Sequence, residues 1–443
     1  MRLKRTGLLL MVVAAFVMAL GGCADPEIAG RGIAENLDRE TEALLEKESR
    51  LSFDFFWNEA NAEPGSKGYG LVADRAPGNP GLSSVASTGF GLTALAIGAE
   101  RGWVTRQEAE ERASGTLDTL LNHAAKEHGF LYHFLDMRDG SRAPGSEVSV
   151  IDTAIALNGA IVAGEYFGGD VKEKAGELAA QVEWPWYVDP ANNQFYMGYS
   201  PEGGFAGHWD FYAEQMMMYV LAAGSDTHPV KGDLFYAFKR DSRAYGNGRP
   251  FIHSWFGSIF TYQFTHGWLD FRGLTDREGV DWWDNSVAAS ESARQYAIDI
   301  ASDYGTFGPN AWGLTASDGP DGYNGLYGSP PSGFDDAAHA VDGTLAPAGA
   351  LGSIVFTPEA ALDALKHFAA KPELWSEYGL ADAYNEALSP TWISPDVIGI
   401  DKGITLLMIE NYRSGFVWEL YGRNELVKAG VQAVGLVPAE PAR

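Results

Sequence analysis

The chain has 443 residues and a formal net charge of −27, with 46% hydrophobic and 21% charged residues. This length and composition indicate a large globular protein of one or two domains and exclude a disordered chain. The negative charge repels nucleic acid and polyanionic glycans, so we expect no nucleic-acid partner and favour neutral ligands. The 13 Trp, 19 Tyr and 23 Phe residues include many in loops, which favours a site that stacks flat ligands.

The N-terminus has the pattern of a targeting segment. Basic residues within the first six positions precede an apolar run over 8–20, which is too short for a comfortable membrane span. The sequence Leu-Gly-Gly-Cys that follows resembles a bacterial lipobox, and Cys23 is the only cysteine of the chain. We predict a signal peptide over 1–22, a lipid anchor at Cys23 and a tether over 23–32. An ordinary secretory signal is the alternative.

Helical periodicity dominates the rest of the chain. The segment 183–199 has the turn residues of a hairpin, and 305–358 is a long loop of a kind that compact domains keep for a function. We predict helices over 33–61, 87–102, 105–127, 149–167, 171–182, 253–271, 282–304, 358–369, 381–388, 400–413 and 416–426, and another within 203–229.

About twelve helices without a βαβ alternation indicate an all-α fold. A closed ring of helix pairs, an (α/α)6 toroid (six-hairpin barrel), fits this count and places the long loops on one face. A generic α-solenoid is the alternative, although no repeat can be aligned. No linker divides the chain, so we predict a single domain over 33–443.

The stretch 203–229 combines glycines, aromatic residues and an apolar run. Glu214 lies in this run among Tyr, Met and Val residues, so we predict that it is buried within a helix. Burial raises the pKa of a carboxyl group, which suits a general acid. Asp210 lies one turn earlier, too close to leave room for a substrate and a water, and we interpret it as a helix-start cap.

Other acids lie where helices are predicted to start. Asp152 and Asp401 occupy positions at which a carboxylate commonly caps a helix or interacts with its dipole, so a structural role competes with a catalytic one. The nine histidines form no H-x-x-x-H pair, and no nucleotide loop or nucleophile elbow is present. We therefore expect no metal and no cofactor.

Four stretches, 224–229, 263–272, 312–323 and 409–415, together resemble the bacterial glucoamylase-like family (glycoamylase-like domain), which includes endo-β-1,2-glucanases. The resemblance covers about residues 45–430. It implies the toroid, an acid/base glycosidase mechanism and a neutral β-glucan partner, with β-1,2-glucan as the first choice. The lipobox implies a lipoprotein of the bacterial cell envelope, and Ala24 in place of Asp after Cys23 favours the outer membrane, facing the periplasm or the surface.

An inverting glycosidase needs an acid and a base about 6.5–9.5 Å apart. Glu214 is the expected acid, Asp401 the first candidate for the base and Asp152 the second. We expect substrate-binding roles for Glu147, Trp209, His266, Trp268, Arg272, Trp312, Asp318, Tyr323, Trp392 and Asn411. Three alternatives stay open: an exo-acting or sophorose-releasing enzyme, a polysaccharide lyase on the same fold, and a non-catalytic glycan-binding lipoprotein.

Overall fold

The computed structural model describes residues 32–34 and 37–439. The predicted signal peptide, Cys23 and nearly all of the tether lie outside these residues. The α-helices of the described chain are α1 (Arg39–Asn58), α2 (Val85–Glu100), α3 (Arg106–Asn122), α4 (Val150–Phe167), α5 (Gly169–Ala180), α6 (Met216–Gly224), α7 (Phe264–Trp268), α8 (Trp282–Asp299), α9 (Pro347–Leu351), α10 (Pro358–Ala369), α11 (Gly399–Arg413), α12 (Phe416–Arg423) and α13 (Glu425–Val434).

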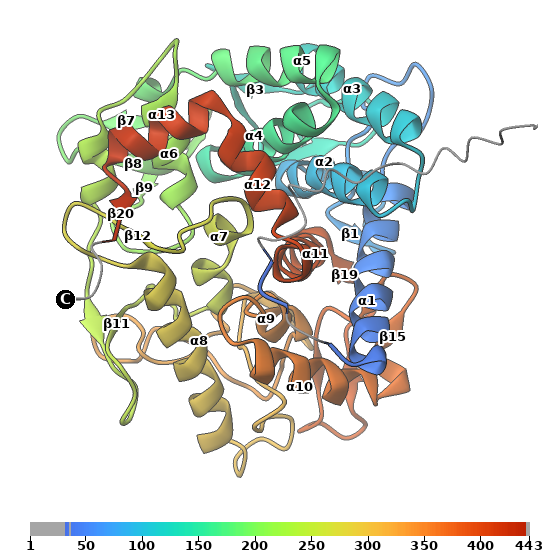
Figure 1. Ribbon diagram of the computed structural model, residues 1–443, viewed down its shortest axis with the longest axis vertical. Coiled ribbons are helices and arrows are strands. Elements are labelled where there is room, and N and C mark those ends of the chain that lie inside the picture. The colour runs from blue at the N-terminus through green and yellow to red at the C-terminus, as the bar shows by residue number, and fades with distance from the viewer. Residues whose placement is uncertain (1–31, 35–36, 440–443) are drawn as a thin grey trace, which may run out of the picture.

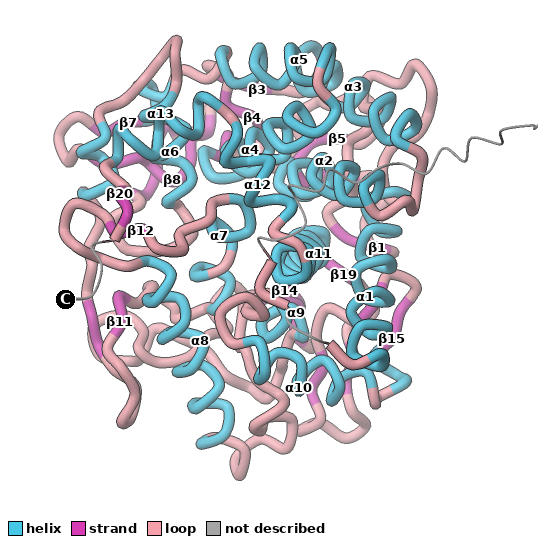
Figure 2. The backbone as a smooth tube through the Cα atoms, in the orientation of Figure 1, coloured by secondary structure: helices cyan, strands magenta, loops and turns pink. Residues whose placement is uncertain are grey.

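Short antiparallel strands fill the connections between these helices (Figure 2). Most pair in twos, and the largest sheet joins β6, β8, β7 and β9. The strands are β1 (Arg75–Ala76), β2 (Leu82–Ser84), β3 (Lys126–Glu127), β4 (Phe130–Leu131), β5 (Phe134–Asp136), β6 (Val148–Ser149), β7 (Val188–Asp189), β8 (Gln194–Ser200), β9 (Gly204–His208), β10 (Ser242–Arg243), β11 (Phe251–Ile252), β12 (Leu274–Thr275), β13 (Ser317–Gly319), β14 (Gly322–Asn324), β15 (Trp375–Ser376), β16 (Gly379–Leu380), β17 (Tyr384–Asn385), β18 (Trp392–Ile393), β19 (Val397–Ile398) and β20 (Val437–Pro438).

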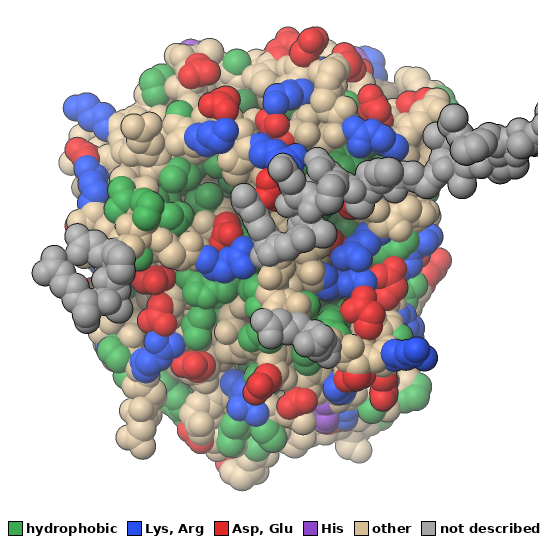
Figure 3. Space-filling model, viewed as in Figure 1, with side chains coloured by type: hydrophobic (Ala, Val, Ile, Leu, Met, Phe, Trp, Pro, Cys, Tyr) green, Lys and Arg blue, Asp and Glu red, His purple; other side chains and the backbone are tan. Residues whose placement is uncertain are grey.

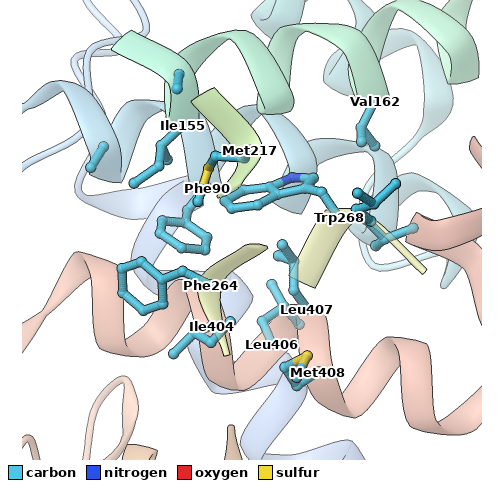
Figure 4. Close-up of a cluster of buried hydrophobic side chains, with 14 of the residues drawn as sticks. Phe90, Ile155, Val162, Met217, Phe264, Trp268, Ile404, Leu406, Leu407 and Met408 are labelled. Atoms are coloured by element: carbon cyan, nitrogen blue, oxygen red, sulfur yellow. The ribbon is translucent and has the colours of Figure 1, made fainter. Parts of the chain in front are cut away.

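The central helices are apolar, and the peripheral ones are amphipathic. In Figure 1, α11 is seen nearly end-on, while α1, α3, α5, α8 and α10 lie towards the periphery. Side chains from α2, α4, α6, α7 and α11 meet in one buried cluster that contains Phe90, Met217 and Trp268 (Figure 4). Because α2 and α4 are buried on nearly every face, their sequences are apolar all round rather than on a single stripe. The core therefore lies where these helices meet.

Two glycines let α2 and α4 pack closely. A Cβ atom on Gly159 would lie 1.9 Å from the carbonyl oxygen of Gly89, and one on Gly89 would lie 2.5 Å from that of Ile155. Both distances are well inside van der Waals contact. Any larger side chain at either position would therefore force the two helices apart.

Charged side chains are scattered over the surface. Acidic and basic residues are interspersed on the face of the molecule in Figure 3. Many of these charges form ion pairs, for example Arg249 with Asp284 at 2.7 Å on α8. Although the protein has a negative net charge, many of its surface charges are therefore paired with an opposite charge.

The helix expected over 105–127 is α3, and Thr105 caps its N-terminus. Thr105 Oγ1 accepts a hydrogen bond from the Glu108 backbone nitrogen at 3.2 Å, and the Glu108 carboxylate accepts one from the Thr105 nitrogen at 3.0 Å. This reciprocal capping box satisfies two amide groups that the start of a helix leaves without partners.

Replacing Thr105 with Ala should lower the free energy of unfolding by about 1 kcal/mol, because one of these amides loses its acceptor. Chemical denaturation of the two proteins measures the difference. Gln107→Ala, an exposed change in the same helix, should alter the stability by less than about 0.5 kcal/mol. Equal stabilities of wild type and Thr105→Ala would contradict the capping role.

Two helix predictions are wrong. The segment 253–271 contains only a short 3-10 turn at Ile259–Tyr262 and α7, because Gly257 has φ of 63° and packs against the Ser329 carbonyl. The segment 381–388 forms β17, whose pairing with β18 overrides its helical propensity. In both segments the apolar residues reflect burial rather than helical periodicity.

Candidate active site

The N-terminal ends of α2, α4 and α11 open onto one cavity of about 430 Å³. Two adjoining hollows, of about 650 and 550 Å³, share part of its wall. Glu214 is the residue that all three have in common. The wall of the first cavity includes Asp74, Arg75, His133, Asp152, Glu214 and Tyr323.

Glu214 lies in a turn and not within a helix, contrary to the sequence prediction. The helix α6 begins two residues later, at Met216. Thr265 Oγ1 donates a hydrogen bond to the Glu214 backbone oxygen at 2.7 Å, and the fully buried Gln215 side chain bridges Ala213 N and Phe211 O. This network fixes the backbone, so that the carboxyl group is held in the cavity wall.

The Glu214 carboxyl group has the properties of a proton donor. Burial raises its pKa to about 7, and the nearby negative charge of Asp152 acts in the same direction. In the described part of the chain, its carboxyl oxygens accept no hydrogen bond from another side chain that would stabilise the ionised form. A substantial fraction of Glu214 is therefore protonated near neutral pH.

Asp152 belongs to a chain of polar groups beside Glu214. Its backbone nitrogen donates to Ser149 Oγ, which caps α4, and its carboxylate accepts the Ser149 hydroxyl at 2.5 Å. His133 lies between Asp152 and Glu147, with nitrogen–oxygen distances of 3.7 and 2.8 Å. Burial alone would lower the pKa of His133, but the two carboxylates outweigh it and raise the pKa to about 9. At neutral pH, His133 is therefore an imidazolium that holds both acids.

Asp401 is buried in the first turn of α11, next to Asp382. Burial, and then the negative charge of Asp318, raise the pKa of Asp382 to about 6, while burial and the negative charge of Asp382 raise the pKa of Asp401 well above its ordinary value. Each has one buried oxygen without a hydrogen-bond donor among the described residues. Two carboxyl groups in this arrangement share one proton, so the pair carries about one negative charge near neutral pH.

Arg75, in the wall of the Glu214 cavity, is linked through Asp318 to this pair, which lines a separate cavity of about 10 Å³. It donates to both oxygens of Asp318, at 2.9 and 3.1 Å, and to Asp74 at 3.1 Å. The Asp318 backbone nitrogen in turn donates to Asp382 at 2.9 Å. Asp318 thus positions other groups in the wall, because its own oxygens are occupied by Arg75 and by Ser394 at 3.1 Å.

Two aromatic residues of the predicted set do lie in the walls. Trp209 lines both adjoining hollows, and its buried indole nitrogen has no acceptor within the described chain. Tyr323, in β14, is 49% exposed and lines the first two cavities. Its hydroxyl pKa is raised, first by the enclosed position of the hydroxyl and then by the negative charges of Asp401 and Asp382.

Several predicted binding residues are instead part of the core or the surface, which corrects the sequence analysis. Trp268 and Trp312 are fully buried, and Trp268 Nε1 donates to Thr93. Burial lowers the pKa of His266 to about 3, so it is neutral and packs against aromatic rings. The remaining three are Asn411, which donates to the Gly267 carbonyl, Arg272, which pairs with Asp270, and Trp392, which pairs with Asn385 in a strand ladder.

Asp210 is likewise no helix cap. It precedes a turn, its side chain is 52% exposed and it lies 3.5 Å from Lys239. The sequence analysis also missed His133 and Arg75 as members of the site, and Asp382 as the partner of Asp401. Their partners lie far away in the sequence, so only His133, between two aromatic residues in a loop, carried a visible signal.

No group of three or more His, Cys, Asp or Glu side chains with the arrangement of a metal site exists among the described residues. The chemistry available to the cavity is that of carboxyl groups, one imidazolium, one guanidinium and aromatic rings. A partly protonated acid in the wall of a cavity of this size, with a charged carboxyl pair linked to that wall through Arg75 and Asp318, fits acid/base chemistry on a neutral ligand.

The described chain is mostly helical and has a cavity lined by carboxyl groups. Comparisons with known proteins find the same type of fold in glucoamylase-like proteins and β-1,2-glucanases. A family model named Glycoamylase and described as "Putative glucoamylase" matches residues 207–425. The structure of the endo-β-1,2-glucanase from Chitinophaga pinensis, solved with sophorotriose and glucose, superposes with a TM-score of 0.80 at 26% identity. That match covers 91% of this chain and 99% of the other. The chain is therefore related to glucoamylase-like proteins and β-1,2-glucanases.

Two comparisons with Parabacteroides distasonis give the same relationship. The exo β-1,2-glucooligosaccharide sophorohydrolase (non-reducing end) is 27% identical over 433 residues, covering 89% of this chain and 58% of the relative. The β-1,2-glucanase structure has a TM-score of 0.79 at 26% identity and covers 91% of this chain and 61% of the other. The chain thus spans about three fifths of these relatives' length.

Proposed function

We propose that the protein is a glycoside hydrolase that cleaves a neutral β-glucan, specifically β-1,2-glucan, by general acid/base catalysis with inversion. The observation that carries the proposal is the position of Glu214, a carboxyl group with a pKa of about 7, in the wall common to three adjoining cavities. The printed activities of the relatives support the choice of linkage.

We also propose that the central helices close an (α/α)6 toroid around this site. Support comes from successive contacts between neighbours: α2 packs against α4 and α11, α4 against α6, and α11 against α9. Thr265 Oγ1 contacts Met217 N between α7 and α6, and Gln263 Nε2 donates to the Gly349 carbonyl in α9. These contacts link six inner helices in a ring, with the remaining helices outside.

In the proposed reaction, Glu214 donates its proton to the glycosidic oxygen as the bond from this oxygen to the anomeric carbon breaks. A water attacks the opposite face of that carbon and gives a proton to Asp401, which passes the proton that it already holds to the Asp382 carboxylate. Glu214 then regains a proton from solvent, and the pair releases one. A shared proton leaves the pair one negative charge, as a base requires. Asp152 is the alternative base because it lines the same cavity as Glu214.

Incubation of the protein with linear β-1,2-glucan, and NMR of the first product anomers, tests the function. We expect reducing ends of inverted, α configuration. Products that retain the β configuration would refute inversion. Unsaturated products would establish a lyase, and tight binding without turnover would establish a glycan-binding protein. The chain length of the products separates endo from exo cleavage.

The base is tested by comparing Asp401→Asn with Asp152→Asn. We expect Asp401→Asn to lower kcat by about 10²–10⁴-fold, since its amide cannot accept a proton. Asp152→Asn should have a smaller effect, because it alters the arrangement around Glu214 without removing the base. A greater loss in Asp152→Asn than in Asp401→Asn would transfer the role of base to Asp152.

We further propose that Cys23 carries a lipid anchor that holds the enzyme in the bacterial cell envelope. The support is the lipobox-like sequence before Cys23. Metabolic labelling with a fatty acid, compared between the wild type and Cys23→Ser, tests the anchor. Equal labelling of both would refute it.

A further inference from the structure

Two aromatic rings in the wall of the hollow of about 650 Å³, Phe334 and Trp255, are more exposed than large apolar side chains usually are, and they lie beside the buried ring of Phe211. Phe334 is 63% exposed and Trp255 is 38% exposed. Their ring centroids lie 5.1 Å apart, and Trp255 also contacts Phe211, at 5.4 Å. We call Phe211, Trp255 and Phe334 the aromatic shelf. Large exposed apolar surface of this kind commonly marks a binding site.

The shelf does not owe its exposure to a loosely held loop. Arg243 donates to the carbonyl oxygens of Ser332 and Gly333, at 3.0 and 2.7 Å, and its guanidinium pairs with Asp336 at 3.1 Å. The Gly333 nitrogen donates to the Trp255 carbonyl at 2.7 Å. Phe334 therefore projects outward from a loop fixed on both sides, and the two rings are held in one relative orientation.

The shelf is continuous with the candidate active site. The hollow of about 650 Å³ has Phe334 and Trp255 in its wall together with Tyr323 and Glu214. Lys239 and Asp210 supply polar groups at the same place, with the ammonium of Lys239 lying 5.4 Å from the centre of the Phe334 ring. The apolar face of a pyranose ring can stack on aromatic rings while its hydroxyls meet such charges.

We propose that the aromatic shelf is a distal subsite that binds a sugar unit of the same glucan chain, beyond the units held at Glu214. This inference rests on the proposed function, since it assigns the occupant of the hollow from its continuity with Glu214. The subsite adds binding energy only for chains long enough to reach the shelf. The enzyme then favours longer oligosaccharides through a lower KM, with kcat little affected.

The test is steady-state kinetics of the wild type and Phe334→Ala on β-1,2-linked oligosaccharides from the disaccharide to the decasaccharide. We expect Phe334→Ala to raise KM for the long substrates by about 3- to 10-fold. The kcat values, and the kinetics on the shortest substrate that is cleaved, should not change. Trp255→Ala should act in the same direction. Leu388→Ala removes another exposed apolar side chain, 42% exposed, and should leave every constant unchanged.

Calorimetry measures the binding of the decasaccharide without turnover when the protein carries Glu214→Gln. Adding Phe334→Ala to this variant should raise the Kd by the same factor as it raises KM. Equal KM values of wild type and Phe334→Ala on every length, with turnover intact, would overturn the shelf alone. If the wild type neither cleaved nor bound the oligosaccharides at any length, both the proposed function and the shelf would be overturned. A change in oligomeric state of Phe334→Ala with unchanged sugar kinetics would assign the shelf to protein association and overturn the subsite.

Discussion

Replacing Glu214 with Gln is expected to lower kcat on β-1,2-glucan by about 10²–10⁴-fold while the protein stays folded. The amide has nearly the same shape as the carboxyl group but cannot donate a proton to the leaving oxygen. Steady-state kinetics and circular dichroism measure the two effects. Glu291→Gln, which removes an exposed carboxylate on α8, is the matched control and should keep full activity. Full activity of Glu214→Gln would remove Glu214 from the role of acid.

The pH dependence gives an independent check on the same residue. Because the pKa of Glu214 is about 7 and its protonated form is the active one, wild-type kcat/KM should fall as the pH rises through about 7. The folded state binds this proton more tightly than the unfolded chain, in which the pKa is near 4.5. The stability of the wild type should therefore decrease between about pH 4.5 and pH 7, by an amount of the order of 3 kcal/mol, and Glu214→Gln should lack this decrease.

Replacing Lys402 with Met is expected to lower the free energy of unfolding by about 3–5 kcal/mol. Lys402 Nζ lies 2.9 Å from the Glu48 carboxylate, and the two side chains are only 5% and 1% exposed. Glu48 also accepts hydrogen bonds from Leu380 N at 2.9 Å and Ser52 Oγ at 3.3 Å. Removing the ammonium leaves a buried carboxylate without its counter-charge. Urea denaturation measures the loss.

Two further variants show whether the loss comes from the unpaired charge. The double variant Glu48→Gln/Lys402→Met should recover much of the stability, because no buried charge remains. Lys428→Met breaks an exposed pair with Glu425 and should cost less than about 1 kcal/mol. If Lys402→Met were no less stable than Lys428→Met, the buried pair would have no structural importance.

Local features of the fold could be predicted from the sequence. The helix that begins after Thr105 and the apolar helix that ends at Phe167 follow from residues adjacent in the chain, and the structure confirms both. The prediction of a helix over 253–271 was wrong because a buried irregular segment is as apolar as a buried helix. Short apolar runs do not distinguish the two.

The candidate site shows a similar division. Glu214 was predicted to be buried and protonated from its apolar neighbours, and the structure confirms its raised pKa although it lies outside the helix. The partnership of Arg75 with Asp318 joins residues 243 positions apart, and no local pattern encodes it. Two of the four tryptophans that the sequence analysis assigned to ligand binding, Trp268 and Trp312, are core residues, because aromatic residues serve packing and recognition equally well.

The contact between Gly89 and Gly159 has a consequence for how this scaffold can diversify. Both helices run away from the cavity, so the distance at which the glycines hold them also sets the separation of Ser84 and Ser149 at their starts. Because Gly89 and Gly159 have only hydrogen as a side chain, α2 and α4 approach closely there, and this approach sets the width of the cavity between the two serines, more than one helical turn away. A methyl group added at either glycine would widen this part of the cavity without contacting a catalytic group. Such a substitution would allow a bulkier glycan to bind.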